Sequence, residues 1–286
     1  MKNLYAAATT CAMAITAGVL CLGVATAAQI NLPRVEPMPN EPAPYLMRDW
    51  LDVTQGYVDD VLDDTKTGTY LPLLSWITSE PWEGMFIMPA YVGSPMPGTT
   101  EAILALPLIV SGTLAGYDMT NYNGHDTVTG AAVTYYCASQ QMADNDGGCG
   151  SPEFWYKMLP TIFLVQLADL YPGEGGLPDK VNAIADKLYD ASIVLGGSED
   201  PWLLPNYNYF TFNFNTMLPV TNGSFVESGS AAAFAWISYM AYTKSDDPDH
   251  LTAADWGMSY LSDVVPIEQN PLYEVMLRYG PITAAG

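Results

Sequence analysis

The 286-residue chain has few basic residues, little histidine and few cysteines. It contains 9 Lys and Arg against 31 Asp and Glu, with 2 His and 4 Cys, and its formal net charge is −22. Such a surface repels phosphate backbones and anionic lipids, so we expect neither nucleic acid nor a membrane surface as a partner. The scarcity of Lys and Arg also disfavours an anionic polysaccharide. A hydrophobic content of 49% excludes disorder of the whole chain.

The N-terminus has the features of a secretory signal peptide over residues 1–27. Lys2 precedes an uncharged apolar stretch that ends in the small-x-small sequence Ala25-Thr26-Ala27. An uncleaved membrane anchor is the alternative, because about 20 apolar residues can span a bilayer. The cleavage motif favours export, so we expect a periplasmic or extracellular protein without membrane contact after cleavage.

Two cysteines remain after the signal peptide, Cys137 and Cys149. An even pair in an exported chain predicts a disulfide, and two free thiols are the alternative. The bridge would close a short loop and stabilise the fold by about 2–3 kcal/mol on chain-entropy grounds.

Helical periodicity dominates the chain after a Pro-rich segment at 28–44. Residues 154–170 and 231–242 are apolar on nearly every side, which is typical of enclosed helices. Residues 178–195 and 250–264 each carry a single apolar stripe, which is typical of outer helices. Repeated inner–outer hairpins build a helical toroid. The predicted fold class is therefore all-α, an (α/α) toroid of inner–outer helical hairpins over a domain at 45–286.

One turn carries a family resemblance. It consists of Tyr239-Met240-Ala241-Tyr242-Thr243-Lys244 followed by Asp249-His250-Leu251-Thr252-Ala253-Ala254. With the hairpin pattern over 98–286, this turn resembles the six-hairpin toroid superfamily of glycoside hydrolases and polysaccharide lyases. The resemblance implies a substrate groove at one end of the ring and leaves the reaction open. Only three or four hairpins can be counted, so the chain is a fragment, the ring is incomplete, or an oligomer closes it.

Three residues are candidate catalytic groups. His125 lies in a dense polar loop and can exchange protons near neutral pH, and Asp118 lies in the same loop. Glu227 precedes the apolar helix at 231–242, where a raised pKa would suit a proton donor. We expect Glu227 as acid and Asp118 as base of a hydrolase. Alternatively, His125 and a tyrosine serve a lyase, or these residues only cap helices and form turns.

Aromatic side chains in the loops are candidates for stacking on sugar rings, because Tyr and Trp combine a flat apolar face with a polar edge. Core packing is the alternative for each of them. The candidates are Trp82, Trp155, Tyr156, Trp202, Tyr207 and Tyr209.

Two acidic motifs hint at metals. Asp59, Asp60 and Asp63 match a DDxxD motif, and residues 144–148 are similar to part of a calcium loop. The first lacks a second metal motif and a basic clamp, and the second lacks the closing Glu. We interpret them as a solvated helix end and a turn, and expect no metal and no cofactor.

The favoured function is a secreted carbohydrate-active enzyme that hydrolyses a neutral glycan. Its carboxylates would lie about 5–5.5 Å apart for retention or 6.5–9.5 Å for inversion. The alternatives are a periplasmic isomerase or dehydratase of a small apolar alcohol, and a non-catalytic glycan-binding protein. An aromatic groove without paired carboxylates would indicate the last. The expected partner is an oligosaccharide or another small molecule, and an oligomer is compatible with the pattern.

Overall fold

The computed structural model describes residues 49–88, 101–150, 153–220, 227–264 and 275–285. The signal peptide predicted at 1–27 and the Pro-rich segment at 28–44 lie outside these residues. Residues Asp49–Gly286 belong to one compact unit. Within the described residues, no helix has the length and apolar character needed to cross a membrane.

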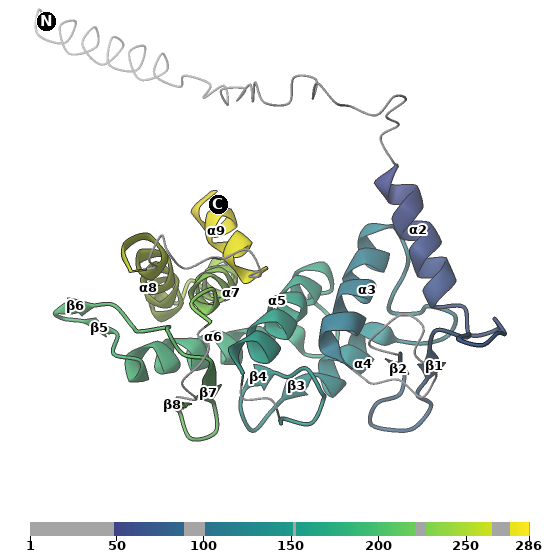
Figure 1. The fold of residues 1–286 in the computed structure, drawn as a ribbon, viewed down its shortest axis with the longest axis horizontal. Coiled ribbons are helices and arrows are strands. Elements are labelled where there is room, and N and C mark those ends of the chain that lie inside the picture. The colour runs from purple at the N-terminus through teal and green to yellow at the C-terminus, as the bar shows by residue number, and fades with distance from the viewer. Residues whose placement is uncertain (1–48, 89–100, 151–152, 221–226, 265–274, 286) are drawn as a thin grey trace, which may run out of the picture. The chain divides into compact units, whose positions relative to one another are not determined.

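The helices and strands follow one another in a mixed order (Figure 1). The first half contains α2 (Trp50–Val61), β1 (Ser75–Trp76), β2 (Phe86–Ile87), α3 (Ala102–Leu114), α4 (Thr127–Thr134), β3 (Tyr136–Cys137) and β4 (Met142–Ala143). The second half contains α5 (Phe154–Leu170), α6 (Leu177–Val194), β5 (Ser198–Glu199), β6 (Trp202–Leu203), β7 (Thr211–Asn213), β8 (Leu218–Val220), α7 (Ser230–Ser245), α8 (Pro248–Asp263), the 3-10 helix η3 (Met276–Arg278) and α9 (Tyr279–Ala285).

The prediction of an all-α toroid is wrong. The described residues form helices together with four antiparallel two-stranded sheets, which pair β1 with β2, β3 with β4, β5 with β6 and β7 with β8. Each sheet is a hairpin of consecutive strands that lie between the predicted helices. The longest pairs Thr211 with Val220 and Asn213 with Leu218. Strands of two or three residues are too short to show an alternating pattern, so the loops looked irregular.

The long helices of the second half form most of the core. Figure 1 shows α7 between α8 and α5. Ala232, Phe234 and Ile237 of α7 have no exposed surface, as expected for a helix that is apolar on every side. Gly257 of α8 permits close packing on α7, because a Cβ there would lie 2.6 Å from the carbonyl oxygen of Ala231. The helix ranges lie close to those predicted from periodicity.

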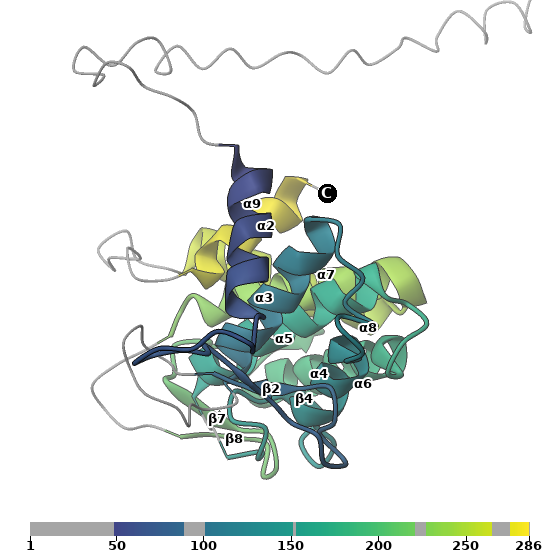
Figure 2. The same cartoon turned by 90° about the vertical axis from the view of Figure 1, so that its right-hand side faces the viewer.

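The first half of the chain attaches to this core through α3, which packs on α5 and on α2, and through β4, which packs on α5 and α6. Figure 2 shows α2 beside α3. The Gln55 side chain of α2 donates a hydrogen bond to the Ala115 carbonyl at 3.0 Å. Only Val58 and Val61 of α2 are buried, so this helix contributes little to the core.

Candidate functional site

Asp118 lies in the loop after α3, where its side chain is exposed. Its carboxylate accepts hydrogen bonds from the Thr120 hydroxyl at 2.6 Å and from the Thr120 N–H at 3.0 Å. The bond from the hydroxyl is the main cause that lowers the pKa of Asp118. A carboxylate held ionised in this way is a weak base, and it stabilises the turn.

His125 stacks on a tryptophan that the sequence analysis did not select. The ring centroids of His125 and Trp76 are 3.9 Å apart and the planes differ by 6°. His125 is half-buried and lines a cavity of about 300 Å³ together with Glu80, Glu83 and Asp126. We call this the His125 cavity. It gathers one imidazole and three carboxyl groups, which is a set of side chains able to exchange protons.

Two glycines hold the hairpin of β1 and β2 against α4 and so shape the His125 cavity. Gly84 has a φ of +88°, and a Cβ there would lie 2.4 Å from the Asp126 carbonyl oxygen. A Cβ at Gly130 would lie 3.0 Å from the Glu83 carbonyl oxygen. The side chain of Asp126 accepts the N–H of Thr129 at 3.0 Å and caps α4. The backbone contacts therefore fix this part of the wall.

Glu227 is not among the described residues that line the His125 cavity. It precedes α7 and is half-buried, and its N–H donates a hydrogen bond to the Tyr209 carbonyl at 3.1 Å. In Figure 1, α5 lies between α3, which leads to Asp118 and His125, and α7. The described lining of the His125 cavity includes neither Asp118 nor Glu227. The structure thus does not bring the three predicted catalytic residues into one described cavity.

The six aromatic candidates are also dispersed. Tyr207 has no exposed surface and lies 3.0 Å from the Ser192 hydroxyl, so it is a core residue and cannot form a cleft wall. Trp202 is exposed on β6, where its ring lies near that of Trp256. Trp82 is exposed in the turn between β1 and β2, and Tyr156 and Tyr209 are half-buried. Among the cavities described for this part of the chain, Trp155 lines one.

Trp155 belongs to a groove of about 550 Å³ between α3, α5 and α9. We call it the aromatic groove. One face of α5 forms its floor through Trp155, Leu159, Phe163 and Gln166. These positions recur at helical spacing, so their side chains share a face. Trp155, Phe163 and Gln166 are only half-buried, although this helix is otherwise largely enclosed.

The remaining lining of the aromatic groove comes from α3 and from the C-terminal helices. It consists of Ile103, Val275, Arg278, Tyr279 and Ile282. Gln166 hydrogen-bonds to the Tyr279 side chain, and burial raises the pKa of Tyr279. Within the described part of the chain, the groove is lined by no carboxylate and no imidazole.

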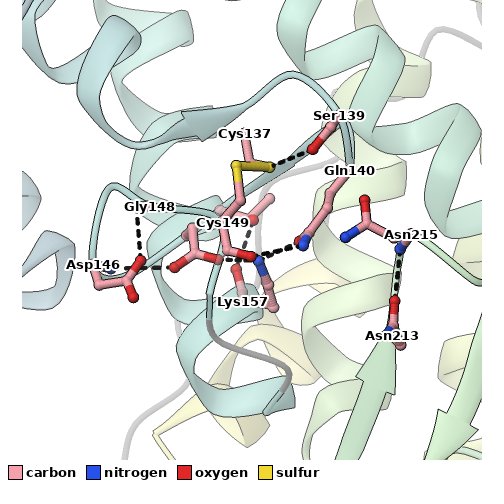
Figure 3. Close-up of polar contacts among 11 residues, drawn as sticks. Cys137, Ser139, Gln140, Asp146, Gly148, Cys149, Lys157, Asn213 and Asn215 are labelled. Carbon is pink, nitrogen blue, oxygen red and sulfur yellow. Dashed lines mark hydrogen bonds and ion pairs between the residues drawn. A yellow bond between two sulfur atoms is a disulfide. The ribbon is translucent and has the colours of Figure 1, made fainter.

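A buried ion pair joins Lys157, in the first turn of α5, to Asp144. It lies next to the disulfide between Cys137 and Cys149 (Figure 3). Lys157 is 1% exposed, and its ammonium donates to the carboxylate of Asp144 and to the side-chain oxygen of Gln140. The Gln140 amide in turn donates to the Cys149 carbonyl at 2.9 Å. Burial lowers the pKa of Lys157 and raises the pKa of Asp144. The sequence does not predict this pair, because Asp144 and Lys157 lie 13 residues apart on different elements and no local spacing pattern joins them.

The disulfide joins Cys137 and Cys149, whose Cα atoms are 5.4 Å apart, as the sequence predicted. The loop that it closes contains the segment considered as a calcium loop. There Asp144 binds Lys157, and Asp146 accepts the Gly148 N–H at 2.8 Å. The loop, the disulfide and the ion pair together fix the first turn of α5, which carries Trp155.

The three acids of the DDxxD motif contact three different side chains, of which Tyr117 is distant in the sequence. Asp59 accepts the Tyr117 hydroxyl at 2.7 Å, and this bond raises the pKa of Tyr117 to about 12. Asp60 pairs with Lys66, and Asp63 accepts from the Thr65 hydroxyl at 2.5 Å. These contacts support the interpretation of the motif as a solvated helix end.

Comparisons with protein-family models, with curated proteins and with solved structures found no match.

Proposed function

We propose that this protein binds a small, largely apolar molecule with one oxygen-bearing group in the aromatic groove. The observation that carries the proposal is the composition of the groove. Six of its nine lining residues have largely apolar side chains. Gln166, Arg278 and Tyr279 supply the polar groups. A concave, mostly apolar cavity of roughly 300–1,000 Å³ with a few convergent polar groups is the usual form of a small-molecule site.

The polar groups favour a neutral alcohol over a glycan. Each sugar hydroxyl needs a hydrogen-bond partner, because a buried polar group without one costs about 1–3 kcal/mol. Three polar side chains suit one hydroxyl group better than the several hydroxyls of a sugar ring. An anionic ligand is disfavoured at long range by the net charge of −22. A small apolar alcohol is therefore the proposed ligand class.

The proposal concerns binding and specifies no reaction. An isomerase or dehydratase needs an acid or a base at the reacting carbon, and Arg278 and Tyr279 are the ionisable side chains in the described lining of the groove. We also propose that binding takes place outside the cytoplasm. The disulfide between Cys137 and Cys149 supports an oxidising compartment.

Titration calorimetry with 1-octanol and cellobiose tests the ligand class. The wild-type protein should bind 1-octanol and show no heat with cellobiose. Phe163→Arg places a charged side chain on the groove floor and should abolish the octanol signal. Ile193→Arg is the matched control, since Ile193 is an exposed residue of α6 and does not line the groove. Cellobiose binding without octanol binding, or equal octanol binding by both variants, would refute the proposal.

A second candidate function, hydrolysis of a neutral glycoside, is favoured by the His125 cavity. Glu80, Glu83 and Asp126 line it beside the imidazole. Hydrolysis needs two carboxyl groups in one cleft. In this proposed hydrolase, the acid and the base are carboxyl groups that line the His125 cavity, and Asp118 and Glu227 take no part.

Hydrolysis of 4-nitrophenyl glycosides measures this second activity. We expect Glu83→Gln to abolish turnover and Asp64→Asn, which alters an exposed carboxylate outside the cavity, to leave it unchanged. Absence of turnover by the folded wild-type protein on every glycoside in a broad panel would count against a glycosidase.

A further inference from the structure

A histidine and two aspartates from α6 and α8 come together at one place on the described surface. Asp186 lies on α6, Asp247 caps the N-terminus of α8, and His250 lies in the first turn of α8. One ligand atom from each residue lies within 4.8 Å of the others. Asp186 is distant in the sequence from the other two, and the packing of α8 on α6 brings it beside them.

The imidazole of His250 is held in a defined orientation. His250 is buried, with 1% of its surface exposed. Its Nδ1 lies 3.0 Å from the Ser245 hydroxyl, and its Nε2 lies 2.8 Å from Oδ1 of Asp186. Metal-binding histidines commonly use one ring nitrogen for the ion while a hydrogen bond to the other fixes the ring. Ser245 supplies that second contact here, and Nε2 faces the carboxylate of Asp186.

We propose that Asp186, Asp247 and His250 bind a zinc ion. One imidazole nitrogen and two carboxylate oxygens are ligands that zinc accepts, at about 2.0–2.2 Å. Three protein ligands leave a fourth position for water, as in open zinc sites. The imidazole distinguishes this set from the all-oxygen sites that calcium and magnesium prefer.

The existing distances require little movement for the ion to enter. Two ligands of a tetrahedral zinc ion lie about 3.3 Å apart for bonds of this length. The Nε2 of His250 and Oδ1 of Asp186 are 2.8 Å apart, so the carboxylate has to retreat slightly. The Asp186 side chain is 65% exposed, so it has room to move. The buried ring of His250 stays in place and provides the fixed ligand.

The local charge favours a cation. The positive end of the α8 dipole opposes it, but the two carboxylates bring two negative charges to the ion. Asp249 adds negative charge close by, since it interacts electrostatically with Asp186, Asp247 and His250, and Glu199 lies close enough to interact with Asp249. A bound ion would also link α6 to the turn between α7 and α8. Zinc should therefore raise the melting temperature of the protein.

Equilibrium dialysis and thermal melting of tag-free, chelator-treated full-length protein test the proposal with zinc chloride alone. The wild-type protein should bind one zinc ion per chain and melt at a higher temperature with zinc. Asp186→Asn keeps the shape of an exposed side chain but weakens a ligand, and zinc affinity should fall by roughly tenfold or more. Asp190→Asn, an exposed acid on the same helix, is the matched control and should bind like the wild type.

His250→Gln removes the imidazole and should abolish binding, and Asp186→Asn keeps the test decisive if that variant fails to fold. Magnesium and calcium chloride should not displace the zinc ion. The proposal is overturned if the folded wild-type protein binds no zinc. It is equally overturned if Asp186→Asn and Asp190→Asn bind alike, or if calcium competes as well as zinc, because each result would indicate attraction to a diffuse acidic surface.

Discussion

Replacement of Lys157 by methionine should strongly destabilise the fold. The substitution removes the ammonium that binds Asp144 and Gln140, while the Asp144 carboxylate stays 1% exposed. Removal of one partner of a buried ion pair typically costs about 3–5 kcal/mol, because the remaining charge has lost its counter-charge. We expect a loss of this size in the free energy of unfolding, measured by urea denaturation at pH 7.

The loss in Lys157→Met should shrink as the pH falls. Burial raises the pKa of Asp144, and Lys157 is among the groups that lower it. Without Lys157 the folded-state pKa rises further above the unfolded value, so the folded state binds the proton more tightly. The stability that this tighter proton binding adds to the folded state is fully present below the unfolded pKa of Asp144. It is lost as the pH rises through the folded pKa. Urea denaturation from pH 4 to pH 7 measures the trend.

The double variant Asp144→Asn, Lys157→Met is the control for this reasoning. It carries no buried charge at either position, so its stability relative to the wild type should vary less with pH than that of Lys157→Met. If the single variant loses less than about 1 kcal/mol at pH 7, or becomes less stable relative to the wild type as the pH falls, the assignment of a buried, paired Asp144 is wrong.

Three further stability predictions concern the disulfide loop, the packing of α8 on α7 and, as a comparison, α2. The double substitution of Cys137 and Cys149 by serine should lower the free energy of unfolding by about 3 kcal/mol, measured by urea denaturation, since it opens a short loop. Gly257→Ala should cost about 1–3 kcal/mol in thermal melting, because the new Cβ would meet the carbonyl of Ala231 at 2.6 Å. Gly56→Ala on α2 meets no atom within 4 Å and should stabilise by up to about 1 kcal/mol, so an equal effect at both glycines would contradict the packing described.

The long helices could be predicted from the sequence because their patterns extend over many residues. The helices α5 to α8 each span 16 to 18 residues, which is enough for apolar periodicity to define them. The eight-residue helix α4 was missed. Its sequence contains Thr, Val and Gly, which are poor helix formers. It is held by the Asp126 cap and by contact with the hairpin of β1 and β2.

The candidate site was predictable only in parts. His125 and Trp155 were selected because their residue types carry chemistry or stack on ligands. Their partners Trp76 and Arg278 were not, since they come from segments distant in the sequence. The spacing of Trp155, Leu159 and Phe163 four residues apart was a signal for a shared face. This spacing did not reveal that the face borders a groove, because the position of α9 on the other side depends on tertiary packing.

Photoaffinity labelling tests the central claim, that the aromatic groove is the ligand site, most directly. An octanol analogue with a diazirine group, irradiated with the wild-type protein, should label peptides from α5 and from α9. Excess 1-octanol should suppress the labelling, and Phe163→Arg should abolish it. Labelling confined to the hairpin of β1 and β2 beside His125, or labelling that excess octanol does not reduce, would contradict the claim.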